Sequence, residues 1–191
     1  MLGWPAKLYG RACLFLGLAT LFWYACMYLV LVSDPALSRR KADLLDMSLL
    51  WTKSRATELF ADLEEGGALR KLYIFYGLDL VFPFIYGPFL SIGLALFLRI
   101  VPGEGLPPNT TAPFARRVIA GLPVGASLFD LAENSTILYL VTQFLRRGEI
   151  GRIASMVGGV CTSCKWVFFG LPLLVGWFEI VQAPRDDEEA F

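Results

Sequence analysis

Four long apolar segments dominate this sequence and leave it few possible folds. They cover residues 12–32, 72–98, 118–145 and 153–180. A helix rises about 1.5 Å per residue and the hydrocarbon core of a bilayer is about 30 Å thick, so roughly 20 residues suffice to cross it. Each segment reaches that length. The sequence therefore predicts an all-α fold, a polytopic membrane bundle of four helices in a single domain.

The composition agrees with a bilayer environment and narrows the set of partners. Hydrophobic residues make up 56% of the 191 positions, well above the level of soluble proteins. Basic and acidic residues balance at 17 each, so no excess of positive charge suggests a nucleic-acid partner. Histidine is absent, and we expect neither a metal site nor a cofactor. The expected partners are the lipid bilayer and, for some functions, further copies of the chain or a larger membrane complex.

The linker between the first two segments is too charged to enter the membrane, yet it has a helical pattern. Apolar or small residues recur at steps of three and four through Leu45, Leu49, Thr52, Ala56, Leu59 and Leu63. We expect an amphipathic helix over residues 40–66 that lies flat on the membrane surface, with Trp51 and Phe60 at the interface. A helix that packs on the end of the bundle is the alternative. Residues 181–191 are predicted to be a disordered acidic tail.

The loops differ in basic residues, and that difference predicts the orientation. The side with both termini has Lys7, Arg11, Arg99, Arg116, Arg117 and Arg185. The opposite side has Arg39, Arg40, Lys41, Lys53, Arg55, Arg70, Lys71, Arg146, Arg147 and Arg152. Because cytoplasmic loops carry the excess of Lys and Arg, both termini are expected outside the cytoplasm. A glycosylation sequon at Asn109 agrees with this orientation.

Ionisable residues interrupt three of the four apolar segments. They are Asp79 in the second, Asp130 and Glu133 in the third, and Lys165 in the fourth. Each charged residue at the centre of a spanning helix costs about 2.5–3.5 kcal/mol on insertion scales, so these residues need partners.

Helical spacing indicates which partners these residues have. Asp130, Glu133 and Asn134 share one face of a helix, and Tyr76 and Tyr86 lie in the same stripe as Asp79. The tyrosine hydroxyls are candidate donors to the carboxylates.

Depth in the membrane indicates that Lys165 pairs with an acid of the third segment. The third and fourth segments meet at a short turn, and Glu133 and Lys165 each lie about 12 residues, or about 18 Å, from it. We therefore predict that Lys165 contacts Glu133 or Asp130. The other acid is expected to be protonated or to share hydrogen bonds with Asp79.

Three short motifs contain these residues. They are Tyr76-x-x-Asp79-x-x-Phe82-Pro83, Phe129-Asp130-x-x-Glu133-Asn134 and Lys165-Trp166. Over roughly residues 55–180 this pattern resembles an uncharacterised family of small, mostly bacterial four-span membrane proteins. The resemblance implies a four-helix membrane fold and brings no known reaction with it.

Three functions are open on these residues. The cluster of Asp130, Glu133, Asn134, Lys165 and Asp79 can hold the helices in register. Alternatively, Asp130 and Glu133 can act as acid and base in a lipid-acting enzyme, although no nucleophile accompanies them. The third alternative is an oligomeric carrier of protons, ions or a small solute, since four spans are few for one transporter.

The Cys161-x-x-Cys164 motif resembles that of the vitamin K epoxide reductase type of thiol oxidoreductase. That family couples its membrane cysteines to others in a loop, and the loops of this chain have none. We therefore expect two small residues at a helix contact.

Overall fold

A computed structural model describes residues 6–98 and 113–181, and within these ranges every regular element is a helix. The all-α prediction is confirmed for this part of the chain. The elements are α1 (Ala6–Val32), α2 (Pro35–Arg39), the 3₁₀ turns η1 (Lys41–Asp43) and η2 (Leu45–Met47), α3 (Lys53–Glu65), α4 (Leu69–Asp79), α5 (Pro83–Phe97), α6 (Pro113–Arg147) and α7 (Arg152–Val181). Asn109 and the tail after residue 181 lie outside the described residues.

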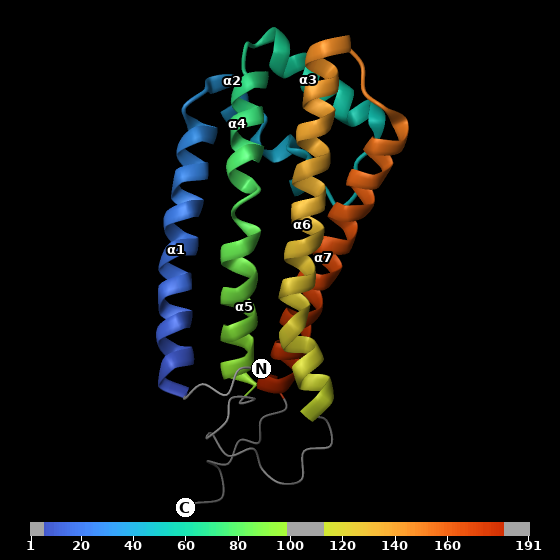
Figure 1. Cartoon of the computed structure of the whole chain (residues 1–191). Helices are drawn as coiled ribbons and strands as arrows, with labels where there is room; N and C mark the ends of the chain where they lie inside the picture. The colour runs from blue at the N-terminus through green and yellow to red at the C-terminus, as the bar shows by residue number, and fades with distance from the viewer. Residues whose placement is uncertain (1–5, 99–112, 182–191) are drawn as a thin grey trace, which may run out of the picture.

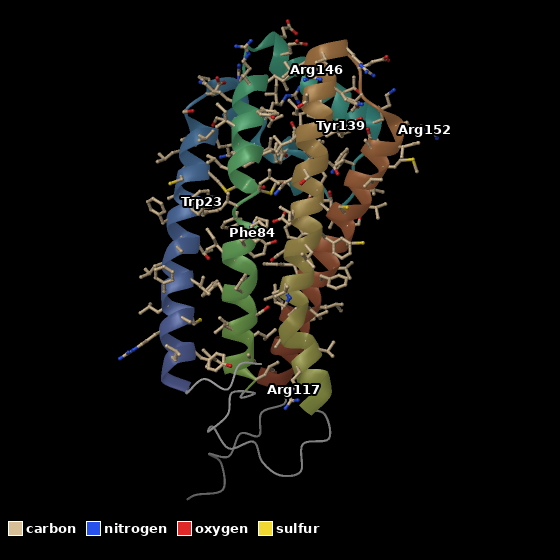
Figure 2. All side chains as sticks on the ribbon, in the orientation of Figure 1. Trp23, Phe84, Arg117, Tyr139, Arg146 and Arg152 are labelled. Carbon is tan, nitrogen blue, oxygen red and sulfur yellow. The ribbon has the colours of Figure 1, made fainter. Side chains whose placement is uncertain are left out.

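The long helices stand side by side and alternate in direction (Figure 1). Helix α1 packs against α4 and α5, which run back along it, and α6 packs against both α5 and α7. The short elements α2 and α3 lie together at the end where α6 gives way to α7. Arg146 and Arg152 are at that end and Arg117 is at the other (Figure 2), so cations mark both ends of the long helices.

Within the described residues, two helices are long and apolar enough to cross a membrane. They are Leu8–Val32, with a mean hydropathy of 2.0, and Arg152–Val175, with a mean hydropathy of 1.4. The pair α4 and α5 is a third span if its two halves count together. Helix α6 does not reach the same apolar content, because Asp130, Glu133 and Asn134 lie in its middle. The complete four-span bundle is thus still a prediction.

The second apolar segment is not one continuous helix, as the range 72–98 suggested. It is divided into α4 and α5, which meet at an angle of 41°. Pro83 begins α5 and has no N–H to donate to the carbonyl of Asp79, four residues earlier. The proline therefore explains the break.

The prediction of one surface helix over residues 40–66 is wrong. Regular α-helix begins only at Lys53, where the Thr52 hydroxyl accepts a hydrogen bond from the Arg55 amide, 3.4 Å away. The preceding stretch forms two 3₁₀ turns and then has no regular structure over residues 48–52, and Leu44 and Leu45 are both fully buried. Phe60 is also fully buried, and its ring lies 5.8 Å from that of Phe144. Helix α3 thus packs on the end of the bundle, which was the alternative interpretation.

Ion pairs hold the linker in place. Asp34 caps α2 by accepting from the amides of Ala36 and Leu37, and its carboxylate pairs with the Lys71 ammonium at 3.0 Å. The hydrogen bond from Lys71, helped by those amides, holds the pKa of Asp34 below its usual value. Asp43 lies between Arg40 and Arg55, and their hydrogen bonds likewise lower its pKa.

The hydrophobic core lies in the half of the bundle nearest α3. It combines side chains from α1, the linker, α3, α4 and α6, including Met27, Leu44, Leu59, Phe75 and Ile137. Helix α1 is mostly exposed, and Leu14, Phe15, Leu18, Leu21 and Phe22 are 59–71% exposed. Such a surface fits contact with lipid chains.

Candidate functional site

The ionisable residues of α6 and α7 meet inside the bundle. The Lys165 ammonium lies 2.6 Å from Oε2 of Glu133 and 3.1 Å from Oδ1 of Asp130. All three side chains are buried, with exposed fractions of 9% for Lys165, 0% for Glu133 and 5% for Asp130. The predicted pairing is confirmed, and the lysine contacts both acids.

Neutral donors contact the remaining oxygens of the two acids. The Tyr86 hydroxyl of α5 donates to Oδ2 of Asp130 at 2.8 Å. The Thr162 hydroxyl of α7 donates to Oε1 of Glu133. Tyr86 was predicted as a donor to these carboxylates, and this contact confirms it.

A close approach of α5 and α6 brings Tyr86 to Asp130. At Gly87, the residue after the tyrosine, an added Cβ would lie 1.9 Å from the Ser127 Oγ of α6. No side chain fits there, so glycine is required for this helix spacing. Ser127 in turn donates to the carbonyl of Pro123 on its own helix.

Asn134 connects the broken helix to the cluster. Its Nδ2 donates to the main-chain carbonyl of Asp79 at 3.3 Å and lies 3.5 Å from Oδ1 of Asp130. The Asp79 carbonyl is the one that Pro83 leaves without an intrahelical donor. Asp79 and Tyr76 are themselves buried, at 4% and 0% exposure, on the inner face of α4.

Trp51 is the residue of this site that the sequence interpretation misplaced. It was assigned to the membrane interface, but it is 3% exposed and its Nε1 donates to the Thr162 hydroxyl at 2.9 Å. One residue thus connects the linker to Thr162, and through it to Glu133. The linker also contacts α7 through Leu49, whose carbonyl accepts from the Ser163 hydroxyl at 2.6 Å.

The sequence did have a signal for this contact in the pair Gly158-Gly159. An added Cβ at Gly158 would lie 2.4 Å from the Trp51 ring, and one at Gly159 would lie 2.6 Å from the Trp51 carbonyl oxygen. Adjacent glycines in a membrane helix favour the close approach of another segment. The two glycines do not indicate from the sequence alone that the approaching segment is the linker.

The resulting group has one ammonium between two carboxyls. Its net charge is −1 when both acids are ionised and zero when one of them holds a proton. Tyr86, Thr162 and Asn134 stabilise either state by hydrogen bonding, which a carboxylate buried among apolar helices requires. Such an arrangement can fix helices relative to one another, and its acids can also exchange a proton.

Other residues with possible chemistry take no part in this group. Cys161 and Cys164 are free thiols on α7, half-buried and not joined to each other. Over residues 6–98 and 113–181, no set of three or more His, Cys, Asp or Glu is arranged to hold a metal ion.

No protein-family model, curated protein or solved structure matches this chain. The resemblance of its motifs to a four-span family therefore stays a prediction.

Proposed function

We propose that this chain is a multi-pass integral membrane protein with four crossings whose buried cluster acts as a latch between helices. The observation that carries this proposal is the position of Lys165 between Asp130 and Glu133, with neutral donors on the other carboxyl oxygens. These contacts join α5, α6 and α7, and Trp51 adds the linker. The latch compensates the insertion cost of α6, which the polar residues make the least apolar of the long helices.

The orientation that we propose places both termini outside the cytoplasm. Its support is the excess of Lys and Arg at the end with α3 and the turn between α6 and α7. Reporter fusions after residue 191 and within the turn near Gly148 test it. A cytoplasmic signal from the C-terminal fusion would reverse the assignment.

The latch is tested by removing its members singly. Lys165→Met, Asp130→Asn and Glu133→Gln are expected to lower the yield of folded, monodisperse protein in mild detergent. Ser135→Ala is the matched control, because Ser135 is exposed on α6 and its hydroxyl bonds only to the Leu131 carbonyl of its own helix. Normal yield and unfolding temperature in all three cluster variants would reject the latch.

A second function, action on a lipid, is supported by one observation. An apolar pocket lies between α1, α5, α6 and α7, and its lining residue Phe89 is three residues from Tyr86, or about 4.5 Å along α5. A lipid held there with its ester group toward Tyr86 would place that group close to Asp130 and Glu133, the candidate acid and base. Cluster variants that fold normally but alter the lipid profile of the cell would favour this function over the latch.

A further inference from the structure

The lower half of the bundle, away from α3, has a cavity of about 260 Å³. Four helices line it, with Cys13 of α1, Leu90 and Gly93 of α5, Pro123 of α6, and Phe169 and Pro172 of α7. These residues come from segments far apart in the sequence, so the cavity exists only in the assembled bundle.

The cavity has room because one of its lining residues lacks a side chain. At Gly93 an added Cβ would meet nothing nearer than the Cys13 sulfur, at 3.7 Å. A side chain at this position would therefore begin inside the cavity, next to Cys13.

The lining is apolar apart from the Cys13 thiol, a weak hydrogen-bonding group. A cavity without polar partners does not hold ordered water, so its occupant must be apolar. Its volume is slightly below the range of about 300–1,000 Å³ of sites for whole small molecules. It therefore suits a single hydrocarbon chain better than a complete lipid.

The cavity is reached from the side of the bundle. Two of its lining residues, Phe97 and Leu173, are 49% and 62% exposed. In a membrane-spanning bundle, exposed apolar side chains at this depth face lipid chains and not water. Arg117 lies at the near end of α6 (Figure 2), six residues or about 9 Å from Pro123.

We infer that this cavity binds one acyl chain of a phospholipid from the leaflet on the side of Arg117. The inference rests on the proposed membrane-spanning bundle. The acyl chain enters between Phe97 and Leu173 and lies against Gly93 and Pro123. It ends about one helical turn from Tyr86. The bound acyl chain fills the space among α1, α5, α6 and α7 that side chains leave open.

The test uses the full chain in phosphatidylglycerol–phosphatidylcholine vesicles that include phosphatidylcholine with a diazirine near the end of one acyl chain. After photolysis, mass spectrometry measures labelling of the cavity residues Leu90 and Leu94 relative to Leu14 and Leu18, which are exposed on α1. Gly93→Leu is expected to lower the relative labelling of the cavity by about tenfold, equivalent to ~1.4 kcal/mol of binding free energy. Gly121→Leu, the same change at an exposed position of α6 with nothing within 4 Å, is expected to leave it unchanged.

The outcomes separate this inference from the proposed fold. Equal cavity labelling in wild type and Gly93→Leu would overturn the inference that the cavity binds an acyl chain. Labelling confined to α1 would also overturn it while leaving the membrane protein intact. If the protein does not insert into the vesicles, neither α1 nor the cavity is labelled, and the proposed membrane bundle itself fails. Should Gly93→Leu not fold, Leu94→Trp fills the same cavity from the next residue of α5.

Discussion

The indole nitrogen of Trp51 donates a hydrogen bond to the hydroxyl of Thr162, a residue 111 positions away in the sequence. This contact joins the linker to the buried cluster, because Thr162 itself donates to Glu133. Trp51 therefore anchors the linker to the interior of the bundle.

Replacing Trp51 by Phe removes this hydrogen bond and keeps most of the buried ring. We expect a loss of about 0.5–1.5 kcal/mol in unfolding free energy, the usual net value of one hydrogen bond. Trp51→Ala should cost about 3–5 kcal/mol, because it also leaves a cavity. Denaturant unfolding in mild detergent measures both. Equal stability of Trp51→Ala and wild type would mean that the linker does not pack on α7.

Lys165→Met leaves two buried carboxyls without their cation, and we expect a loss of about 3–5 kcal/mol. Glu133→Gln in the same chain should recover part of that loss, since one of the two acids is then neutral. A double-mutant cycle of the two substitutions measures the coupling, expected at about 0.5–3 kcal/mol. Strict additivity would show that Lys165 and Glu133 do not interact.

Asn134→Leu removes the donor to the Asp79 carbonyl, and the unpaired buried carbonyl should cost about 1–3 kcal/mol. In a Pro83→Ala background the cost should be smaller, because alanine, unlike proline, has an N–H that can bond to that carbonyl within the helix. Thermal unfolding of the two single variants and the double variant tests this. The same loss from Asn134→Leu in both backgrounds would separate Asn134 from the helix break.

Gly158→Ala places a methyl group against the Trp51 ring and should destabilise by about 1–3 kcal/mol, as overpacking does. Gly170→Ala on the same helix meets nothing within 4 Å and serves as the control. Trp51→Leu should restore tolerance of alanine at position 158. If Gly158→Ala and Gly170→Ala have the same unfolding temperature, the close packing of the linker on α7 is wrong.

The Asp34–Lys71 pair should make stability depend on pH in acid. The pKa of Asp34 in the folded protein lies below the ordinary 3.8, so its contribution is complete above that value and is lost as pH falls through the lower folded pKa. Asp34→Asn should reduce the acid dependence of the unfolding temperature below about pH 4. The pKa of Asp43, between Arg40 and Arg55, is lowered in the same way. Asp43→Asn should therefore also reduce the acid dependence, and the double variant should reduce it most. An unchanged acid profile in the double variant would contradict both assignments.

The sequence predicted the long helices and the cluster because both follow from local rules. Apolar length defines the helices, and the spacing of Asp130, Glu133 and Asn134 puts them on one face. The short turn between α6 and α7 predicted that Lys165 lies at the same depth in the bundle as Glu133. The pairing of Lys165 with an acid of α6 could thus be predicted from the sequence, whereas its contact with both acids was not.

The linker could not be predicted in the same way. Its pattern of three- and four-residue steps is real over α3, but it extends by chance through Leu45 and Leu49, where no α-helix forms. Leu45 is buried and Leu49 is 71% exposed, so they do not share a helical face. The path of the chain there is set by Gly158 and Thr162 on α7, and such long-range packing overrides local periodicity.

The contact between Trp51 and Thr162 also has a consequence for biosynthesis. Trp51 leaves the ribosome long before Thr162 has been made, and α6 is complete before Lys165 reaches its acids. Until α7 is made, the Trp51 indole and the carboxyls of Asp130 and Glu133 therefore lack their contacts with that helix. Synthesis of α7 supplies Thr162 and Lys165 together, so the buried cluster and the linker contact form only after this helix has been made.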